Sequence, residues 1–255
     1  MGLRQFTYAV AALIVASSTL TDAAEIKVIG GSAVIPAMAE LVPRFEHSSG
    51  HRVRTDFDAA IGAITDRVRK DEVADVVIVS GAQIDTLIRE AKVAPGTRVD
   101  IAKVGVGLFV RKGAPKPDIS SVEAFKRTLS AAKSIGYNDP AAGAPVSLYL
   151  IDLFARLGIA AEMNQKTIVF KQRSERFEAV ARGDVEIGFN QMSEIVAAPG
   201  IELVGALPAD IQSYTQFSSG IVASGGNQAT AREFVTFIAS LQARGVWQSK
   251  GFEAP

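Results

Sequence analysis

Four short runs of small, uncharged residues each stand between a strand-like segment and a helical pattern, and they are the positions best placed for chemistry. In an open parallel sheet, such junctions lie beyond the carboxyl ends of the strands, where helix N-termini leave backbone N–H groups free to bind an anion. Small side chains let a ligand approach that backbone closely. The sequence therefore predicts ligand contacts at Gly31, Ser32, Ala59, Ala60, Ser80, Gly81, Ala144 and Ser147.

The same runs have a plainer interpretation, because short strand-to-helix loops prefer small residues in any case. One such junction says little about binding. Four of them together favour convergence on a shared cleft that holds a small anion.

Apolar segments of strand length alternate with helical patterns along the whole chain, which is typical of βαβ units and an α/β fold. Gly158 and Gly183 follow two of the helical patterns, where a left-handed backbone favours glycine. We expect strands at residues 26–29, 53–57, 76–79, 104–110, 134–137, 167–170, 186–189 and 216–223. We expect helices at residues 33–47, 62–70, 84–91, 121–131, 146–157, 175–182, 228–241 and 243–249.

Two long extended stretches, 104–110 and 216–223, enclose a complete α/β unit. This order predicts a chain that crosses into a second lobe and returns. We expect lobe I to comprise residues 24–104 and 217–255, and lobe II residues 105–216. Closure would be a hinge motion around residues 103–108 and 214–219.

The N-terminal segment is typical of a cleaved signal peptide rather than of folded structure. Arg4 precedes an apolar run from Phe6 to Ala16, and small residues occupy positions 21 and 23. The apolar run is about half of the ~20 residues that a membrane span requires. We expect residues 1–23 to be removed and the mature protein to be periplasmic.

The composition excludes several classes of protein. The 27 basic and 27 acidic residues balance, so the chain lacks the positive excess of a nucleic-acid binder. It has no cysteine, which excludes disulfide scaffolds, zinc fingers and thiol nucleophiles. His47 and His51 are four residues apart, but Gly50 interrupts any helix between them. We therefore expect no metal site and no cofactor.

Five segments carry a family resemblance through their order and spacing. They are Ile26–Ser32, Val73–Ser80, Asn138–Pro140, Ala181–Phe189 and Gly251–Phe252. The chain resembles the periplasmic molybdate-binding branch of the ABC-transporter solute receptors. The resemblance implies a type II-like binding protein with two lobes of mixed, mainly parallel sheet, joined by a two-strand hinge. It also implies a monomer that passes its ligand to a membrane permease.

The resemblance further implies an oxyanion held by backbone amides, serine hydroxyls and one tyrosine. Ser32 keeps the first hydroxyl, but Ala59 or Ala60 replaces the second serine and Gln191 replaces the tyrosine. Each lost hydrogen bond to a charged group costs about 1.5–3 kcal/mol. Two losses would weaken molybdate binding by roughly 10²- to 10⁴-fold. The planar amides of Asn190 and Gln191 suit carboxylates better, so a small organic polycarboxylate joins the oxyanions as a candidate ligand.

A catalytic alternative stays open, because some receptors of this branch resemble aconitate isomerases. Moving a proton along a small tricarboxylate needs groups that hold the carboxylates and one general base. Asp58 or Glu194 could be that base, with Ser32, Ser80 and the two amides holding the substrate. In the plainer interpretation, both acids merely face the positive end of a helix. We expect a binding protein and keep the isomerase as the alternative.

Overall fold

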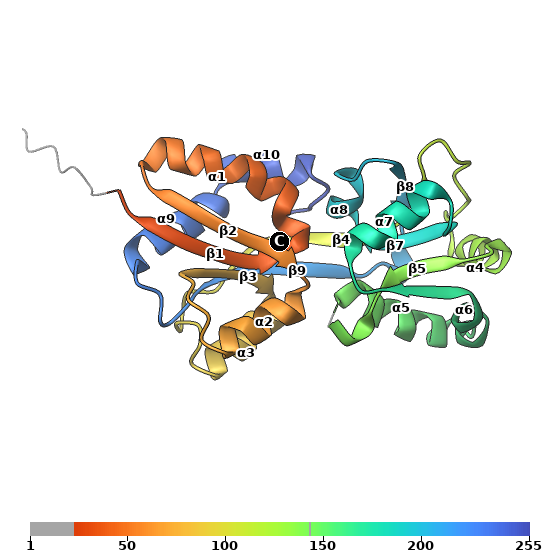
Figure 1. The fold of residues 1–255 in the computed structure, drawn as a ribbon, viewed down its shortest axis with the longest axis horizontal. Coiled ribbons are helices and arrows are strands. Elements are labelled where there is room, and N and C mark those ends of the chain that lie inside the picture. The colour runs from red at the N-terminus through yellow and green to blue at the C-terminus, as the bar shows by residue number, and fades with distance from the viewer. Residues whose placement is uncertain (1–22, 143) are drawn as a thin grey trace, which may run out of the picture.

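The computed structural model describes residues 23–142 and 144–255 and is a mixed α/β protein, as the sequence predicts. Two bodies lie side by side, and each has its own hydrophobic core (Figure 1). The predicted signal peptide lies outside the described residues, apart from Ala23. Among the residues that are described, no helix is long and apolar enough to cross a membrane.

The first body is built on the strand order β2-β1-β3-β9, with β1, β2 and β3 parallel and β9 antiparallel to β3. The central strands β1 and β3 are buried almost throughout, which explains why they are short apolar runs. Helices α1 and α10 lie over one side of this sheet and α2 and α3 over the other (Figure 1). The elements are β1 (Glu25–Gly31), the 3-10 helix η1 (Ser32–Val34), α1 (Ile35–Ser49), β2 (Arg52–Ala59), α2 (Ile61–Arg69), β3 (Val76–Ser80), α3 (Gly81–Arg89), β9 (Tyr214–Ile221), α9 (Gln228–Ile238) and α10 (Leu241–Ser249).

The second body continues the strand order as β4-β7-β5-β6, with β8 also paired to β4. Strands β5, β6 and β7 are parallel, whereas β4 is antiparallel to β7 and β8. The ring of Phe189 on β7 packs edge-on between those of Phe125 and Phe154. The elements are β4 (Val99–Arg111), α4 (Val122–Ala131), β5 (Ile135–Asn138), the 3-10 helix η2 (Pro140–Ala142), α5 (Pro145–Arg156), α6 (Ala160–Lys166), β6 (Thr167–Phe170), α7 (Arg173–Arg182), β7 (Ile187–Gln191), α8 (Met192–Val196), β8 (Ile201–Ala206) and the 3-10 helix η3 (Ala209–Ile211).

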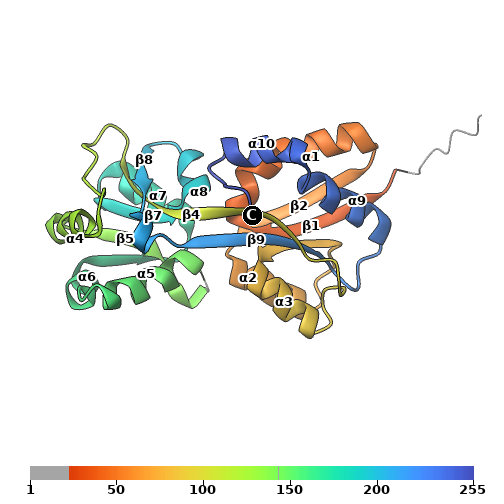
Figure 2. The same cartoon turned by 180° about the vertical axis from the view of Figure 1, so that it is seen from behind.

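Strands β4 and β9 run side by side between the two bodies (Figure 2). Residues up to Gly105 of β4 pair with β9, and residues from Val106 onward pair with β7 and β8. The side chain of Gln212 accepts a hydrogen bond from the N–H of Val106 at 2.9 Å and donates one to its carbonyl at 3.0 Å. Strand β4 therefore changes its pairing partners within residues 103–108, the segment where the sequence predicts a hinge.

Most expected elements are present, with shifted ends. Helix α3 begins at Gly81, whereas the sequence predicts a start at residue 84. The predicted start is too late because the first turn of this helix carries no apolar pattern. The α-helices and the strand that the sequence analysis missed, α6, α8 and β8, are short or only partly buried. Gly158 (φ 71°) and Gly183 (φ 87°) adopt the predicted left-handed conformation after helices.

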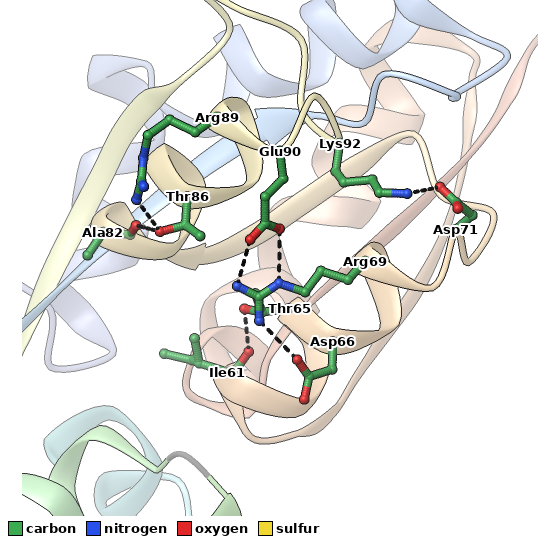
Figure 3. A network of polar contacts seen from close by, with 10 residues as sticks. All are labelled: Ile61, Thr65, Asp66, Arg69, Asp71, Ala82, Thr86, Arg89, Glu90 and Lys92. Carbon is green, nitrogen blue, oxygen red and sulfur yellow. Dashed lines mark hydrogen bonds and ion pairs between the residues drawn. The ribbon is translucent and has the colours of Figure 1, made fainter.

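Basic residues on α2 are paired with acidic neighbours. Arg69 bonds to Glu90 at 2.9 Å and to Asp66 at 3.1 Å, which ties α2 to α3 (Figure 3). Arg67 pairs with Asp56 and Glu72. The positive charges of this helix face are therefore largely neutralised.

Candidate functional site

A cavity of about 460 Å³ lies between the two bodies. The first body contributes η1, which follows β1, and the carboxyl end of β2 with the start of α2, and the second contributes the end of β7, α8 and the starts of α5 and α7. The polar side chains of its lining are Ser32, Asn138, Ser147, Lys171, Gln172, Arg173, Ser174, Arg176, Asn190, Gln191 and Glu194.

Two helix N-termini, one from each body, face this cavity. Ala60 and Ala144 precede α2 and α5, both in extended conformation, and neither can cap its helix with a side chain. The first N–H groups of a helix have no partner within it, so they remain available to a bound anion. Pro145 at the start of α5 removes one such donor. Two of the four predicted junctions thus line the same cavity, and anion binding at them stays a prediction.

The structure brings most of the predicted site residues together. Those that line the one cavity are Ser32, Ala59, Ala60, Ala144, Ser147, Asn190, Gln191 and Glu194. Direct contact of each with a ligand stays a prediction.

Three predicted residues are not among those that line the cavity. A Cβ atom on Gly31 would lie 2.6 Å from Ile61 Cγ1, so this glycine lets α2 pack against β1. The hydroxyl of Ser80 bonds to Gln83 Oε1 at 3.2 Å. A Cβ atom on Gly81 would meet the guanidinium of Arg98. The third junction is therefore occupied by packing and local hydrogen bonds.

Glu194 holds a buried carboxylate at the boundary of the two bodies. Its Oε1 accepts a hydrogen bond from Ser32 Oγ at 2.7 Å and one from Arg173 Nη1 at 2.8 Å. Glu194 also lies in the first turn of α8, as the plainer interpretation expects. Because the first turn of α8 itself faces the cavity, Glu194 also lines the cavity, and its role as a base stays a prediction.

The neighbouring residue reinforces this junction between the bodies. Ser193 is fully buried, and its hydroxyl donates to the carbonyl of Ala33 at 3.1 Å. Helix α8 thus contacts η1 through two consecutive side chains.

Sequence analysis missed three basic residues of the cavity, namely Lys171, Arg173 and Arg176. The two arginines are three residues apart at the start of α7, so they share one face of that helix. Basic residues in a first helical turn oppose the helix dipole. That unfavourable placement is the sequence signal that could have identified them.

Arg176 is the most unusual side chain of the site. It is 1% exposed, and burial lowers the pKa of its guanidinium to about 10. The charge of Glu194 opposes this lowering, whereas that of Arg173 adds to it. The group remains positively charged at neutral pH. A buried cation needs a hydrogen-bonding counterpart to be stable.

Four buried side-chain nitrogens of the cavity lining have no hydrogen-bond partner among the described residues. They are Nε and Nη2 of Arg176, Nδ2 of Asn190 and Nε2 of Gln191. All four are donors, and buried donors are almost always paired in native proteins. Such a set is suited to a ligand that offers several acceptor oxygens.

Two further predictions concern acids and metals. Asp58 belongs to β2, but its side chain lies outside what the structure describes, so its role as a base stays a prediction. No group of three or more His, Cys, Asp or Glu residues that could hold a metal occurs within the described ranges. His51 accepts a hydrogen bond from the N–H of Ala24 at 3.1 Å.

Comparisons with known proteins agree with this architecture. The chain is 34% identical over 97% of its length to an aconitate isomerase from Pseudomonas sp., of which it covers 95%. Its fold is similar to that of the periplasmic molybdate-binding protein of Azotobacter vinelandii, with a TM-score of 0.76 and 18% identity over 90% of this chain and 99% of that one. The sulfate-binding protein SubI of Mycobacterium tuberculosis gives a TM-score of 0.72 and 18% identity over 90% and 86% of the two chains.

The family assignment rests on nearly the whole chain. Residues 26–253 match the family model described as bacterial extracellular solute-binding protein. The matched range takes in both bodies, both connecting strands and every residue of the cavity lining. The chain belongs to the bacterial extracellular solute-binding protein family.

Proposed function

We propose that this protein binds a small organic polycarboxylate in the cavity between its two bodies and serves as the periplasmic receptor of an ABC transporter. The observation that carries the proposal is the set of unpartnered donors on Arg176, Asn190 and Gln191. Family membership supports the transport role.

Charge favours an anion with more than one negative group. The described lining carries three positive side chains and one negative, Glu194. Two positive charges therefore remain for a ligand, which matches a dianion or a trianion. A volume of about 460 Å³ also falls in the range of about 300–1,000 Å³ typical of small-molecule sites.

The donor chemistry favours carboxylates over a tetrahedral oxyanion such as molybdate. Ser32, the first expected hydroxyl, already donates to Glu194. Ala59 and Ala60 supply no hydroxyl. The remaining donors are largely planar guanidinium and amide groups, which match the flat geometry of carboxylates.

Ligand binding would be coupled to closure of the two bodies. We propose that β4 and β9 act as the hinge, with motion centred on residues 103–108 and 214–219. Contacts made only when the bodies meet, such as that between Ser32 and Glu194, would bias the equilibrium toward the closed state. The predicted signal peptide supports a periplasmic location, and cell fractionation with an antibody against the chain would test it.

A second candidate function is isomerisation of aconitate, favoured by the buried carboxylate of Glu194 and by the relative with that name. The reaction would move one proton along the carbon chain and needs no oxidant. A base removes a proton from the methylene carbon, the electron pair spreads over the allylic system and its carboxylates, and a proton returns to the other end. Glu194 could take the proton directly or through Ser32. Arg173 and Arg176 would stabilise the negative charge that develops.

One pair of measurements separates these functions. Calorimetry with tricarballylate, a saturated tricarboxylate that cannot isomerise, tests binding alone. Proton NMR of trans- and cis-aconitate in D₂O tests turnover and exchange. Tricarballylate binding without turnover supports the receptor, and binding with turnover establishes the isomerase. Binding of molybdate or sulfate with no polycarboxylate binding would contradict the proposal.

A further inference from the structure

The guanidinium of Arg176 is held in one orientation by three neighbours. Its Nη1 donates to Asn138 Oδ1 at 2.5 Å. Its central carbon lies 5.2 Å from the centre of the Phe177 ring and 5.9 Å from that of Phe109. Rings near a guanidinium provide cation–π stabilisation. The side chain is therefore fixed before any ligand arrives.

The two unpartnered nitrogens of this side chain form a bidentate pair of hydrogen-bond donors. Nε and Nη2 lie on the same edge of the planar guanidinium, and one N–H of each points in the same direction. Asn138 occupies Nη1 instead, at the other end of the group. The free edge is the one that binds both oxygens of a carboxylate through parallel hydrogen bonds.

We propose that Arg176 is the specificity-determining residue of the cavity and binds one carboxylate of the ligand through Nε and Nη2. This inference rests on the proposed function and deepens it. Asn190 and Gln191, on the adjoining strand β7, would donate to oxygens of the same ligand. Lys171 and Arg173, which also line the cavity, would face a second carboxylate. The ligand class is then a short-chain acid with at least two carboxylates.

Burial supports this role. The lowered pKa of Arg176 reports a cation that carries an unfavourable desolvation energy in the protein alone. A ligand carboxylate at the free edge would supply the missing counter-charge. Surface arginines of the same helix have no such need, because Arg182 pairs with Asp184 at 2.9 Å and is exposed.

The test compares two conservative variants of helix α7. Arg176→Lys keeps the charge but cannot form two parallel hydrogen bonds, and Arg182→Lys is the matched control. Calorimetry with tricarballylate should show affinity falling about 10- to 100-fold for Arg176→Lys. Arg182→Lys should bind within about twofold of the wild type. Circular dichroism and the melting temperature establish that each variant is folded.

A second variant keeps the test decisive if Arg176→Lys does not fold. Asn138→Ala removes the anchor of Nη1 while keeping the guanidinium, and tricarballylate affinity should fall about 2- to 10-fold. Folded variants that bind tricarballylate as tightly as the wild type would overturn the role of Arg176, with the proposed function intact. Failure of the wild type to bind tricarballylate, succinate or citrate, with sulfate as the comparison anion, would overturn both.

Discussion

Ser32 of η1 and Glu194 of α8 are 162 positions apart in the sequence, yet their side chains meet at 2.7 Å and join the two bodies of the protein. The same Glu194 oxygen also accepts a hydrogen bond from Arg173. One carboxylate oxygen therefore connects a residue of each body with the basic side of the cavity. Closure of the bodies and the charge balance of the site depend on the same group.

Replacing Ser32 with alanine should weaken ligand binding. The variant loses the hydrogen bond between the bodies, and a hydrogen bond to a charged group contributes about 1.5–3 kcal/mol. We expect tricarballylate affinity to fall about tenfold or more and the ligand-induced rise in melting temperature to shrink accordingly. A thermal-shift titration measures both.

Ser80→Ala is the matched control for that experiment, because Ser80 bonds to Gln83 outside the cavity lining. It should bind as the wild type does. A loss of affinity in Ser80→Ala would restore the third junction to the site that the sequence predicts. If the ligand-induced rise in melting temperature is unchanged in Ser32→Ala, the first junction, which contains Ser32, does not belong to the site.

Replacing Glu194 with glutamine separates binding from chemistry. The change removes the negative charge of the described lining but keeps the size of the side chain and a carbonyl oxygen that can accept the hydrogen bond from Ser32, so tricarballylate should bind at least as tightly as in the wild type. If the protein isomerises aconitate, turnover should fall by about 10²- to 10⁴-fold, the usual contribution of a general base. NMR measures the turnover and calorimetry the affinity.

The control for that variant is Glu178→Gln, since Glu178 is exposed on α7 and pairs weakly with Arg182 at 3.7 Å. It should leave both quantities unchanged. Full turnover in Glu194→Gln would assign the base elsewhere, with Asp58 the next candidate.

Acid should remove the stabilising effect of one ion-pair network in the first body. Hydrogen bonds from Arg67 and Lys27 lower the pKa of Glu72 from 4.5 to about 2. Since the pKa is lower in the folded state, the network stabilises the protein above about pH 4.5 and loses this effect as pH falls toward 2. Glu72→Gln should therefore be about 1 kcal/mol less stable than the wild type at pH 7. The difference in free energy of unfolding between Glu72→Gln and the wild type, measured from urea unfolding curves, should narrow as the pH falls. A difference that does not change with pH would refute this explanation.

Gly188 should not tolerate a side chain. A Cβ atom there would lie 2.1 Å from Cζ of Phe109, whose ring is fully buried beneath α7. Overpacking of this kind costs about 1–3 kcal/mol, occasionally more. Gly188→Ala should lower the free energy of unfolding by that amount in urea.

Gly245 in α10 offers the opposite case, because a Cβ atom added there would have no neighbour within 4 Å among the described residues. Alanine in a helix is favoured over glycine by about 0.5–1 kcal/mol. Gly245→Ala should be equal to or more stable than the wild type. Equal effects of the two substitutions would show that backbone entropy, not the Phe109 contact, controls both.

Sequence patterns predicted the fold well where burial is regular. The central strands β1 and β3 are continuous apolar runs, and long helices such as α5 have a clear apolar face. Helix α8 has only five residues, too few for a periodicity to appear. Its position against η1 depends on contacts between distant segments, which no local pattern encodes.

The site was predictable only in part, for a related physical reason. Backbone junctions such as 59–60 can be found from strand-to-helix transitions. The sequence marks Arg176 only as a basic residue in a first helical turn, because its burial and its unpartnered nitrogens appear only in the folded chain. Ser80 illustrates the reverse case, since it occupies a suitable junction but bonds to its own helix.

The path of the chain also sets an order of folding. The sheet of the first body needs β9, and its core needs α9 and α10, all of which are synthesised last. The core of the second body is built from residues 106–211, a continuous stretch. A nascent chain can therefore assemble the second body early, whereas the first must wait for its final forty residues or so. Truncation near residue 213 would leave one ordered half and one exposed, aggregation-prone sheet edge at β3.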